Sequence, residues 1–137
     1  MNANPAFAAS VAPALAESGS SAPGRTAATS LETFEVYRVS LGACRGCASI
    51  LPSLSAVLRD QLLQASSSVV LNVAEGFGSC SRGVKRRHYE IARGSATECI
   101  AVLDLAAALG IAGVAHETRV LFTRVAMMLA KLVARFR

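Results

Sequence analysis

The 137-residue sequence predicts an all-α fold, an antiparallel up-down-up-down four-helix bundle with a disordered N-terminal arm. Three observations predict this fold. Apolar residues make up 53% of the chain and aromatic residues only 5%, so the excess is in small aliphatic side chains that suit close helix packing. These side chains recur every three or four residues, which is the helical period. Gly, Pro and Ser interrupt the pattern at three points, and short connections join antiparallel helices.

The chain divides at about residue 30. Residues 1–29 are rich in Ala, Ser, Pro and Gly and show no sustained periodicity. A segment of this composition cannot bury enough apolar surface to offset its loss of conformational entropy. We therefore expect residues 1–29 to be a disordered arm and residues 30–137 to be the bundle domain.

The first helix is expected to begin near Thr29, because Thr29 and Glu32 have the spacing of a capping box. It carries two apolar stripes, so one can serve the bundle core and the other a contact between subunits. The stripes are Phe34, Tyr37, Leu41, Cys44, Ala48 and Leu51, and Val36, Val39, Ala43, Cys47 and Ile50. Gly42 and Gly46 lie between them and each costs about 1 kcal/mol inside a helix. We expect a close backbone approach there; the alternative is that the helix tolerates them.

Capping and breaking residues predict the remaining boundaries. Pro52 ends the first helix, Ser53 or Ser55 caps the second, and Gly76 and Gly78 stop it. Ser81 caps the third helix, Gly110 stops it, and the fourth begins around Gly113. The apolar face expected for the third helix is Val84, His88, Ile91, Ser95, Cys99, Val102, Leu105 and Leu109.

Composition and motifs bound the function. The net charge of +5 favours anionic partners weakly. No apolar run reaches the ~20 residues of a membrane span, and the first 24 residues lack the basic start of a secretory signal. We therefore expect a cytoplasmic protein without a membrane partner. No nucleophile–base set, metal-ligand spacing or phosphate loop is present, so we expect no catalytic residue, metal or cofactor.

Four cysteines could in principle bind a metal, namely Cys44, Cys47, Cys80 and Cys99. Cys44 and Cys47 have CxxC spacing, but no second close pair follows and neither His is near. We interpret them as small buried side chains in a reducing cytosol. The alternative is a small metal-binding bundle that uses Cys44 and Cys47.

One segment concentrates positive charge at the expected start of the third helix. Arg82, Lys85, Arg86 and Arg87 are 4 of the 14 cations within six residues. Cations at a helix N-terminus oppose the helix dipole, so we expect that these cations do not serve helix stability. A phosphate partner such as RNA or DNA would account for them. The alternative is a solvated surface.

A second group predicts a structural polar network of Asn72, Glu75, Arg93 and Glu98. Pairing the second and third helices antiparallel can bring Arg93 towards Asn72 and Glu75. A buried Arg–carboxylate set would fix the register of the two helices. Gly94, beside Arg93, is expected to mark another close approach.

Two segments resemble a known family: Asn72-Val-Ala-Glu-Gly-Phe-Gly78 and Tyr89-Glu-Ile-Ala-Arg-Gly-Ser95. They are similar to motifs of the bacterial 23S rRNA-intervening-sequence protein family of four-helix-bundle proteins. The resemblance implies a ring-shaped homopentamer. It also extends distantly to the accessory variability determinant of diversity-generating retroelements, which works beside a reverse transcriptase and its RNA. Leu63-Gln64 stands where the family usually has a basic pair, and Val70 where it has Pro.

These features together predict a non-enzymatic, self-assembling scaffold or adaptor. Its expected partners are further copies of itself, RNA or DNA at the basic helix start, and a reverse transcriptase or another protein. The alternative is a purely structural protein–protein interaction module that binds no nucleic acid.

Overall fold

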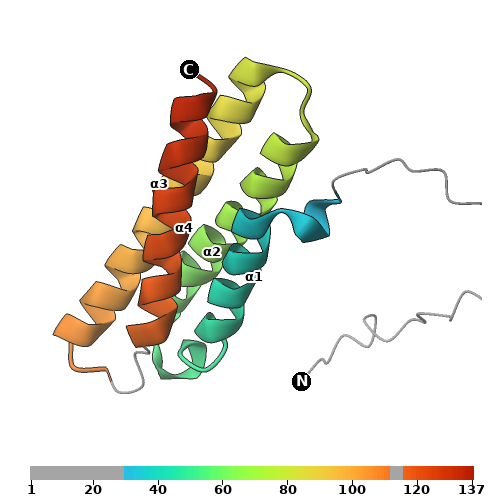
Figure 1. Cartoon of the computed structure of the whole chain (residues 1–137). Helices are drawn as coiled ribbons and strands as arrows, with labels where there is room; N and C mark the ends of the chain where they lie inside the picture. The colour runs from blue at the N-terminus through green and yellow to red at the C-terminus, as the bar shows by residue number, and fades with distance from the viewer. Residues whose placement is uncertain (1–29, 112–115) are drawn as a thin grey trace, which may run out of the picture.

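The computed structural model describes residues 30–111 and 116–137, which form four helices packed side by side (Figure 1). The helices are α1 (Glu35–Cys47), α2 (Ala56–Gly78), α3 (Arg82–Ala108) and α4 (His116–Arg135), with short 3-10 turns at Leu31–Thr33 and Leu51–Ser53. The described residues contain no strand, so the predicted all-α four-helix bundle is confirmed. The predictions for residues 1–29, including the cap at Thr29, and for Gly113 lie outside the described residues.

The ends of α2 and α3 follow the predicted capping chemistry. The Ser55 hydroxyl accepts the Leu58 N–H at 3.3 Å, and the Ser81 hydroxyl accepts the Val84 N–H at 3.4 Å. After α3, Gly110 takes a positive φ of 73°. This conformation lets the N–H of Ile111 reach the carbonyl of Ala106 at 3.0 Å, which closes the helix in a Schellman motif.

The core lies along the bundle axis and is built mainly from aliphatic side chains. Its largest fully buried members are Phe122, Ile50, Leu62, Leu103 and Leu129. Of the two stripes on the first helical run, the one running from Val36 to Ile50 enters the core, whereas members of the other are half-buried or exposed.

None of the helices in the described residues has the length and apolar character needed to cross a lipid bilayer.

The face predicted for α3 is wrong by about one position over much of its length, although Cys99 and Val102 are buried as predicted. Val84, Ile91, Leu105 and Leu109 are 41–64% exposed. The core side of α3 instead comprises Tyr89, Ala92, Ala96, Cys99, Val102, Leu103 and Ala106. The two stripes lie about 100° apart on the helix. Alanines lie on the core side because their small side chains allow close helix packing. The larger aliphatic residues of the predicted stripe are more hydrophobic, which is why the sequence pattern favoured them.

Glycines mark two of the closest helix contacts. Gly76 does not stop α2 but is buried inside it, and a Cβ there would lie 2.5 Å from Cε1 of Tyr89. A Cβ at Gly46 would collide with the side chain of Thr118 on α4, so the close approach predicted there is confirmed. At Gly42 and Gly94 an added Cβ would meet no described atom within 4 Å, so the close approach predicted at these two positions is absent within this chain.

The helices differ in length, which leaves one end of the bundle incomplete. α1 has 13 residues, whereas α2 has 23 and α3 has 27, corresponding to rises of about 20, 35 and 40 Å. Residues 34–36, at the start of α1, line a hollow together with Met128, Lys131 and Leu132 of α4. The start of α1 thus lies beside these residues, which precede the end of α4. The end where α2 stops and α3 starts therefore lacks the cover of α1 (Figure 1).

Replacing Gly76 and Gly94 by Ala should change stability in opposite directions. Gly76→Ala forces a methyl group against the buried ring of Tyr89 and should lower the free energy of unfolding by about 1–3 kcal/mol. Gly94→Ala fills open space on a helix and should raise it by about 0.5–1 kcal/mol. Urea unfolding of both variants measures the difference. A loss of stability in Gly94→Ala would instead place a neighbouring subunit against this residue.

Candidate nucleic-acid interface

The predicted basic segment begins α3, where Ser81 caps the helix and Arg82 is its first residue. The structure gives its four cations different surroundings. Arg82 and Arg87 are exposed, whereas Lys85 and Arg86 are half-buried. Each side chain must therefore be considered by its own contacts.

Lys85 stabilises the end of the preceding helix. Its Nζ donates hydrogen bonds to the carbonyls of Gly76 at 3.0 Å and Phe77 at 2.9 Å. These are unpaired carbonyls of the last turn of α2, where a cation is favoured by the helix dipole. The expectation that this cation has no role in helix stability is therefore wrong for Lys85, because it caps α2 across the turn.

The other three cations remain near the surface. Arg82 donates from Nη2 to the carbonyl of Arg135 at 3.0 Å, and its guanidinium lies 5.5 Å from the ring centroid of Phe136. Arg86 pairs with Glu90 at 3.0 Å. The guanidinium of Arg87 has no hydrogen bond or ion pair to the residues of the described ranges. Arg82 and Arg87 thus keep a charge that no carboxylate of these ranges neutralises.

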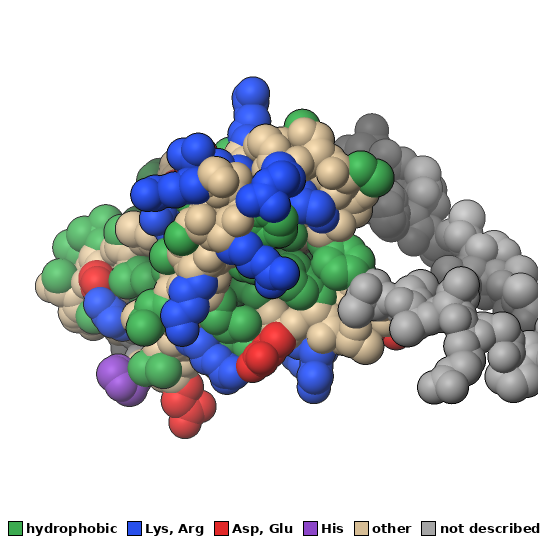
Figure 2. Space-filling view, turned by 45° about the horizontal axis from the view of Figure 1, so that its top comes forward, with side chains coloured by type: hydrophobic (Ala, Val, Ile, Leu, Met, Phe, Trp, Pro, Cys, Tyr) green, Lys and Arg blue, Asp and Glu red, His purple; other side chains and the backbone are tan. Residues whose placement is uncertain are grey.

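The contact between Arg82 and Arg135 brings the end of α4 beside the start of α3. This adds Lys131, Arg135 and Arg137 to the same end of the bundle. Figure 2 turns this end forward and shows Lys and Arg side chains gathered over it, with hydrophobic side chains between them. The α4 cations were not part of the predicted basic segment, because about 50 residues separate them from Arg82.

A hollow of about 610 Å³ opens at this end, where α1 leaves the bundle uncovered. Its lining includes Phe34, Phe77, Tyr89, Phe136, Lys85 and Arg135. The ring centroids of Phe34 and Phe77 are 5.0 Å apart, and those of Tyr89 and Phe136 are 5.9 Å apart. Tyr89 is buried, but the three phenylalanines are only half-buried, so ring surface remains accessible. The sequence signal for this hollow was weak, because its aromatic residues are scattered along the chain.

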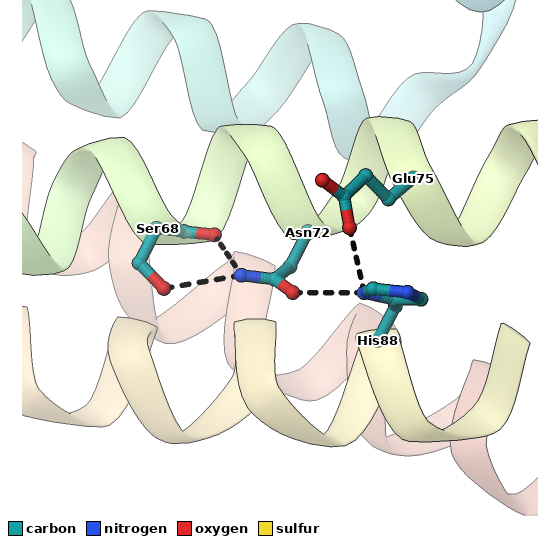
Figure 3. Close-up of polar contacts among 4 residues, drawn as sticks. All are labelled: Ser68, Asn72, Glu75 and His88. Atoms are coloured by element: carbon teal, nitrogen blue, oxygen red, sulfur yellow. Dashed lines mark hydrogen bonds and ion pairs between the residues drawn. The ribbon is translucent and has the colours of Figure 1, made fainter. Parts of the chain in front are cut away.

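The predicted polar network exists in a different form (Figure 3). Asn72 Nδ2 donates to the carbonyl of Ser68 at 2.9 Å and contacts the Ser68 hydroxyl at 3.2 Å. That carbonyl can only accept, so the other amide atom, Oδ1, faces His88 Nδ1 at 2.9 Å. The carboxylate of Glu75 also lies 3.2 Å from His88 Nδ1. Both partners of Nδ1 are acceptors, so this nitrogen carries a proton.

This network joins α2 to α3 along one side of their contact. The Ser68 hydroxyl extends it to the hydroxyl of Ser95 at 2.8 Å. His88 is therefore half-buried and polar, not packed in the core as its place in the apolar stripe predicted. The spacing of Ser68, Asn72 and Glu75, at intervals of four and three residues on one helix face, was the signal that could have located it.

Arg93 and Glu98 do not belong to the network. Both are exposed, and neither side chain forms a hydrogen bond or ion pair within residues 30–111 and 116–137. The prediction of a buried, paired Arg93 is wrong. Ala92 and Ala96 lie on the core face of α3, whereas the side chain of Arg93 lies on the exposed side of the helix. His88 takes the place that Arg93 was expected to fill.

The cysteines are free thiols, and burial raises the pKa of three of them, Cys44, Cys47 and Cys99. Cys44 Sγ contacts the carbonyl of Ser66 at 3.5 Å, and Cys47 Sγ contacts that of Ala43 at 3.4 Å. Burial raises the pKa of Cys44, and burial together with the nearby Cys44 raises the pKa of Cys47 to about 12. Metal binding requires thiolates, so these environments disfavour the metal alternative. The described residues contain no group of three or more potential metal ligands.

Removing Asn72 should destabilise the fold, whereas removing the Arg93 side chain should not. Asn72→Ala leaves His88 Nδ1–H and the Ser68 groups with fewer partners in a half-buried seam, at a cost of about 1–3 kcal/mol. Arg93→Ala changes an exposed side chain and should stay within about 0.5 kcal/mol. Urea titration of both variants tests this, and equal midpoints would contradict it.

Comparison with known proteins identifies the family. The family model described as 23S rRNA-intervening sequence protein matches residues 28–131. Searches of the curated proteins and of the solved structures return no significant match. The matched range includes all of α1, α2 and α3, most of α4, and the segments around Asn72 and Arg93. The chain therefore belongs to the 23S rRNA-intervening sequence protein family.

Proposed function

We propose that this protein is a self-assembling helical scaffold that binds the phosphate backbone of nucleic acid at one end of its bundle, without catalysis. One observation carries the proposal. Residues 75–90 and 131–137, which meet at this end, contain seven Lys and Arg against two Asp and Glu. Their net charge of +5 equals that of the whole chain, so the other residues sum to zero.

The geometry supports backbone binding over recognition of a single small anion. Arg82 and Arg87 at the start of α3 and Arg135 and Arg137 at the end of the chain are all exposed. Figure 2 shows Lys and Arg side chains spread over this end of the bundle. Separated cations can each neutralise a different phosphate of a polymer and release its counterions. The family takes its description from an intervening sequence of 23S rRNA, so RNA is the first nucleic acid to test.

The outer face of α2 and α3 supports self-assembly. Of the exposed large apolar residues, Val57 and Leu71 lie on α2, Val84, Ile91 and Leu105 on α3, and Leu109 at its end. Leu71 lies three residues after Ser68, and Ile91 three after His88, so both flank the polar seam. Leu63-Gln64, which replaces the usual basic pair, is also exposed on α2 and leaves this helix without those two positive charges. A second copy of this chain, which presents the same exposed apolar residues, is the partner that we propose; the family resemblance makes a pentamer the expected number.

A protein-only interaction module is the second candidate function. The exposed apolar residues of α2 and α3 favour it, because large exposed apolar patches mark protein contacts. It requires no nucleic acid, so the next experiment separates the two candidates.

The double variant Arg87→Gln/Arg135→Gln should weaken nucleic-acid binding and reduce its dependence on salt. Losing two phosphate contacts should reduce the slope of log affinity against log salt by roughly 1.5. Fluorescence anisotropy with a labelled RNA between 50 and 200 mM salt measures the slope. The matched control, Arg45→Gln/Arg93→Gln, removes two exposed charges away from this end and should keep the wild-type slope. If the wild-type protein binds neither RNA nor DNA at low salt, the protein-only module is correct.

Leu71→Glu should disrupt the oligomer, and Met127→Glu should leave it intact. Both side chains are 61% exposed, but Leu71 lies on the proposed face of α2 whereas Met127 lies on α4. A charge buried between subunits without a partner is strongly unfavourable. Light scattering coupled to size-exclusion chromatography gives the mass of each variant. A monomeric wild type, or an oligomer that survives Leu71→Glu, would contradict the assignment of this face.

A further inference from the structure

We propose that the aromatic hollow at the basic end holds an unpaired nucleobase, so that the protein binds single-stranded nucleic acid in preference to duplex. This inference rests on the proposed function and specifies its substrate. It assigns a role to a group of residues that phosphate binding alone leaves unused.

Most of the aromatic residues of the described ranges gather in one place. Phe34, Phe77, Tyr89 and Phe136 line the hollow, which leaves Tyr37 and Phe122 as the remaining aromatic residues of the described ranges. Phe34 comes from the start of α1, Phe77 from the end of α2, Tyr89 from α3 and Phe136 from the residue after α4. All four helices thus contribute a ring to the same end of the bundle.

The hollow also stays open to solvent. Here α1 starts too far down the bundle to fill the fourth corner. The three phenylalanines remain half-buried around a space of about 610 Å³. This volume lies within the range of small-molecule pockets, roughly 300–1,000 Å³. Stacking on these rings would remove accessible aromatic surface from water.

The positive charge around the hollow favours an occupant with negative charge. Lys85 and Arg135 line the hollow, and no carboxylate is among the described residues that do so. The guanidinium of Arg82 and the ammonium of Lys85 lie 5.5 and 6.0 Å from the ring centroid of Phe136. A flat ring attached to a negative charge matches such a site, and a nucleotide has both. Proteins that bind single strands combine stacking rings with cations along the backbone.

Duplex nucleic acid lacks the feature that the hollow would recognise. Its bases are stacked and paired, so a base could enter only after leaving the helix, which costs a few kcal/mol. The phosphates of a duplex still reach Arg82 and Arg87 on the open surface. The surface cations therefore serve both forms, and the hollow distinguishes between them.

The experiment compares ligands with and without bases. Fluorescence anisotropy measures the full-length protein against oligothymidylate, an abasic strand of equal length and charge, oligouridylate RNA, and a duplex. Wild-type protein should bind both single strands at least about fivefold more tightly than the abasic strand or the duplex, because one stacked base is worth about 1–3 kcal/mol. Equal affinity for all four ligands would overturn the inference.

A variant at Phe136 localises the effect. Phe136→Leu keeps an apolar side chain but removes the ring, and should reduce affinity for oligothymidylate roughly five- to hundredfold. Its affinity for the abasic strand and its salt dependence should not change. Phe136→Trp restores a ring and should restore the preference for bases, which excludes a general loss of structure. A Phe136→Leu variant that still prefers bases over the abasic strand would contradict the assignment.

The two proposals fail in different ways. If the basic end binds phosphates but the hollow holds no base, all four ligands bind equally and Arg87→Gln/Arg135→Gln still weakens them. If the wild-type protein binds none of the ligands at low salt, the proposed function and this inference are both wrong. If RNA binds tightly and DNA does not, the occupant of the hollow is a ribonucleotide and the inference stands in that narrower form.

Discussion

The contact between Gly76 and Tyr89 is the constraint on which the rest of this structure depends. The missing side chain at Gly76 lets the Tyr89 ring lie directly against α2, and a single methyl group there would collide with it. This contact fixes how far α3 runs past α2. With that register, Asn72 faces His88, Ser68 faces Ser95, and Lys85 reaches the last carbonyls of α2. The polar seam and the cap are thus consequences of one packed pair.

The same tyrosine organises the end of the bundle. Its ring lies 6.4 Å from that of Phe34 and 5.9 Å from that of Phe136, so it connects the start of α1 and the end of α4 to α3. Because α1 is short, these rings close the end incompletely, and an aromatic hollow results. A structural role and a proposed binding role overlap here, because Lys85 both caps α2 and lines the hollow. Arg87 and Arg135 have no such capping role, which makes them better probes of binding.

Most of the net positive charge and most of the exposed apolar surface lie on different parts of this molecule, although Val84 lies within the basic segment. Positive charge concentrates where α2 ends and α3 begins, whereas most of the exposed large aliphatic residues lie along the outer side of α2 and α3. The proposed assembly through that side would repeat the basic end in every subunit. Several weak phosphate contacts on one assembly then act together, because each later contact forms within an already bound complex. Self-association and nucleic-acid binding are in this way compatible on one small domain.

The sequence by itself determined the all-α class, the four helical runs, the cap at Ser81 and the stop at Gly110, because these depend on local periodicity and backbone chemistry. It left Ser53 and Ser55 as alternative caps of α2, and the structure selects Ser55. The sequence also indicated Asn72, Glu75 and the Arg82–Arg87 segment. Only the tertiary structure decided that His88, and not Arg93, joins the polar seam, that alanines form the core side of α3, and that Arg135 lies beside Arg82. The rotation of a helix about its own axis depends on how closely its small residues let a neighbour approach. That distance is a property of two helices together, and no single stretch of sequence contains it.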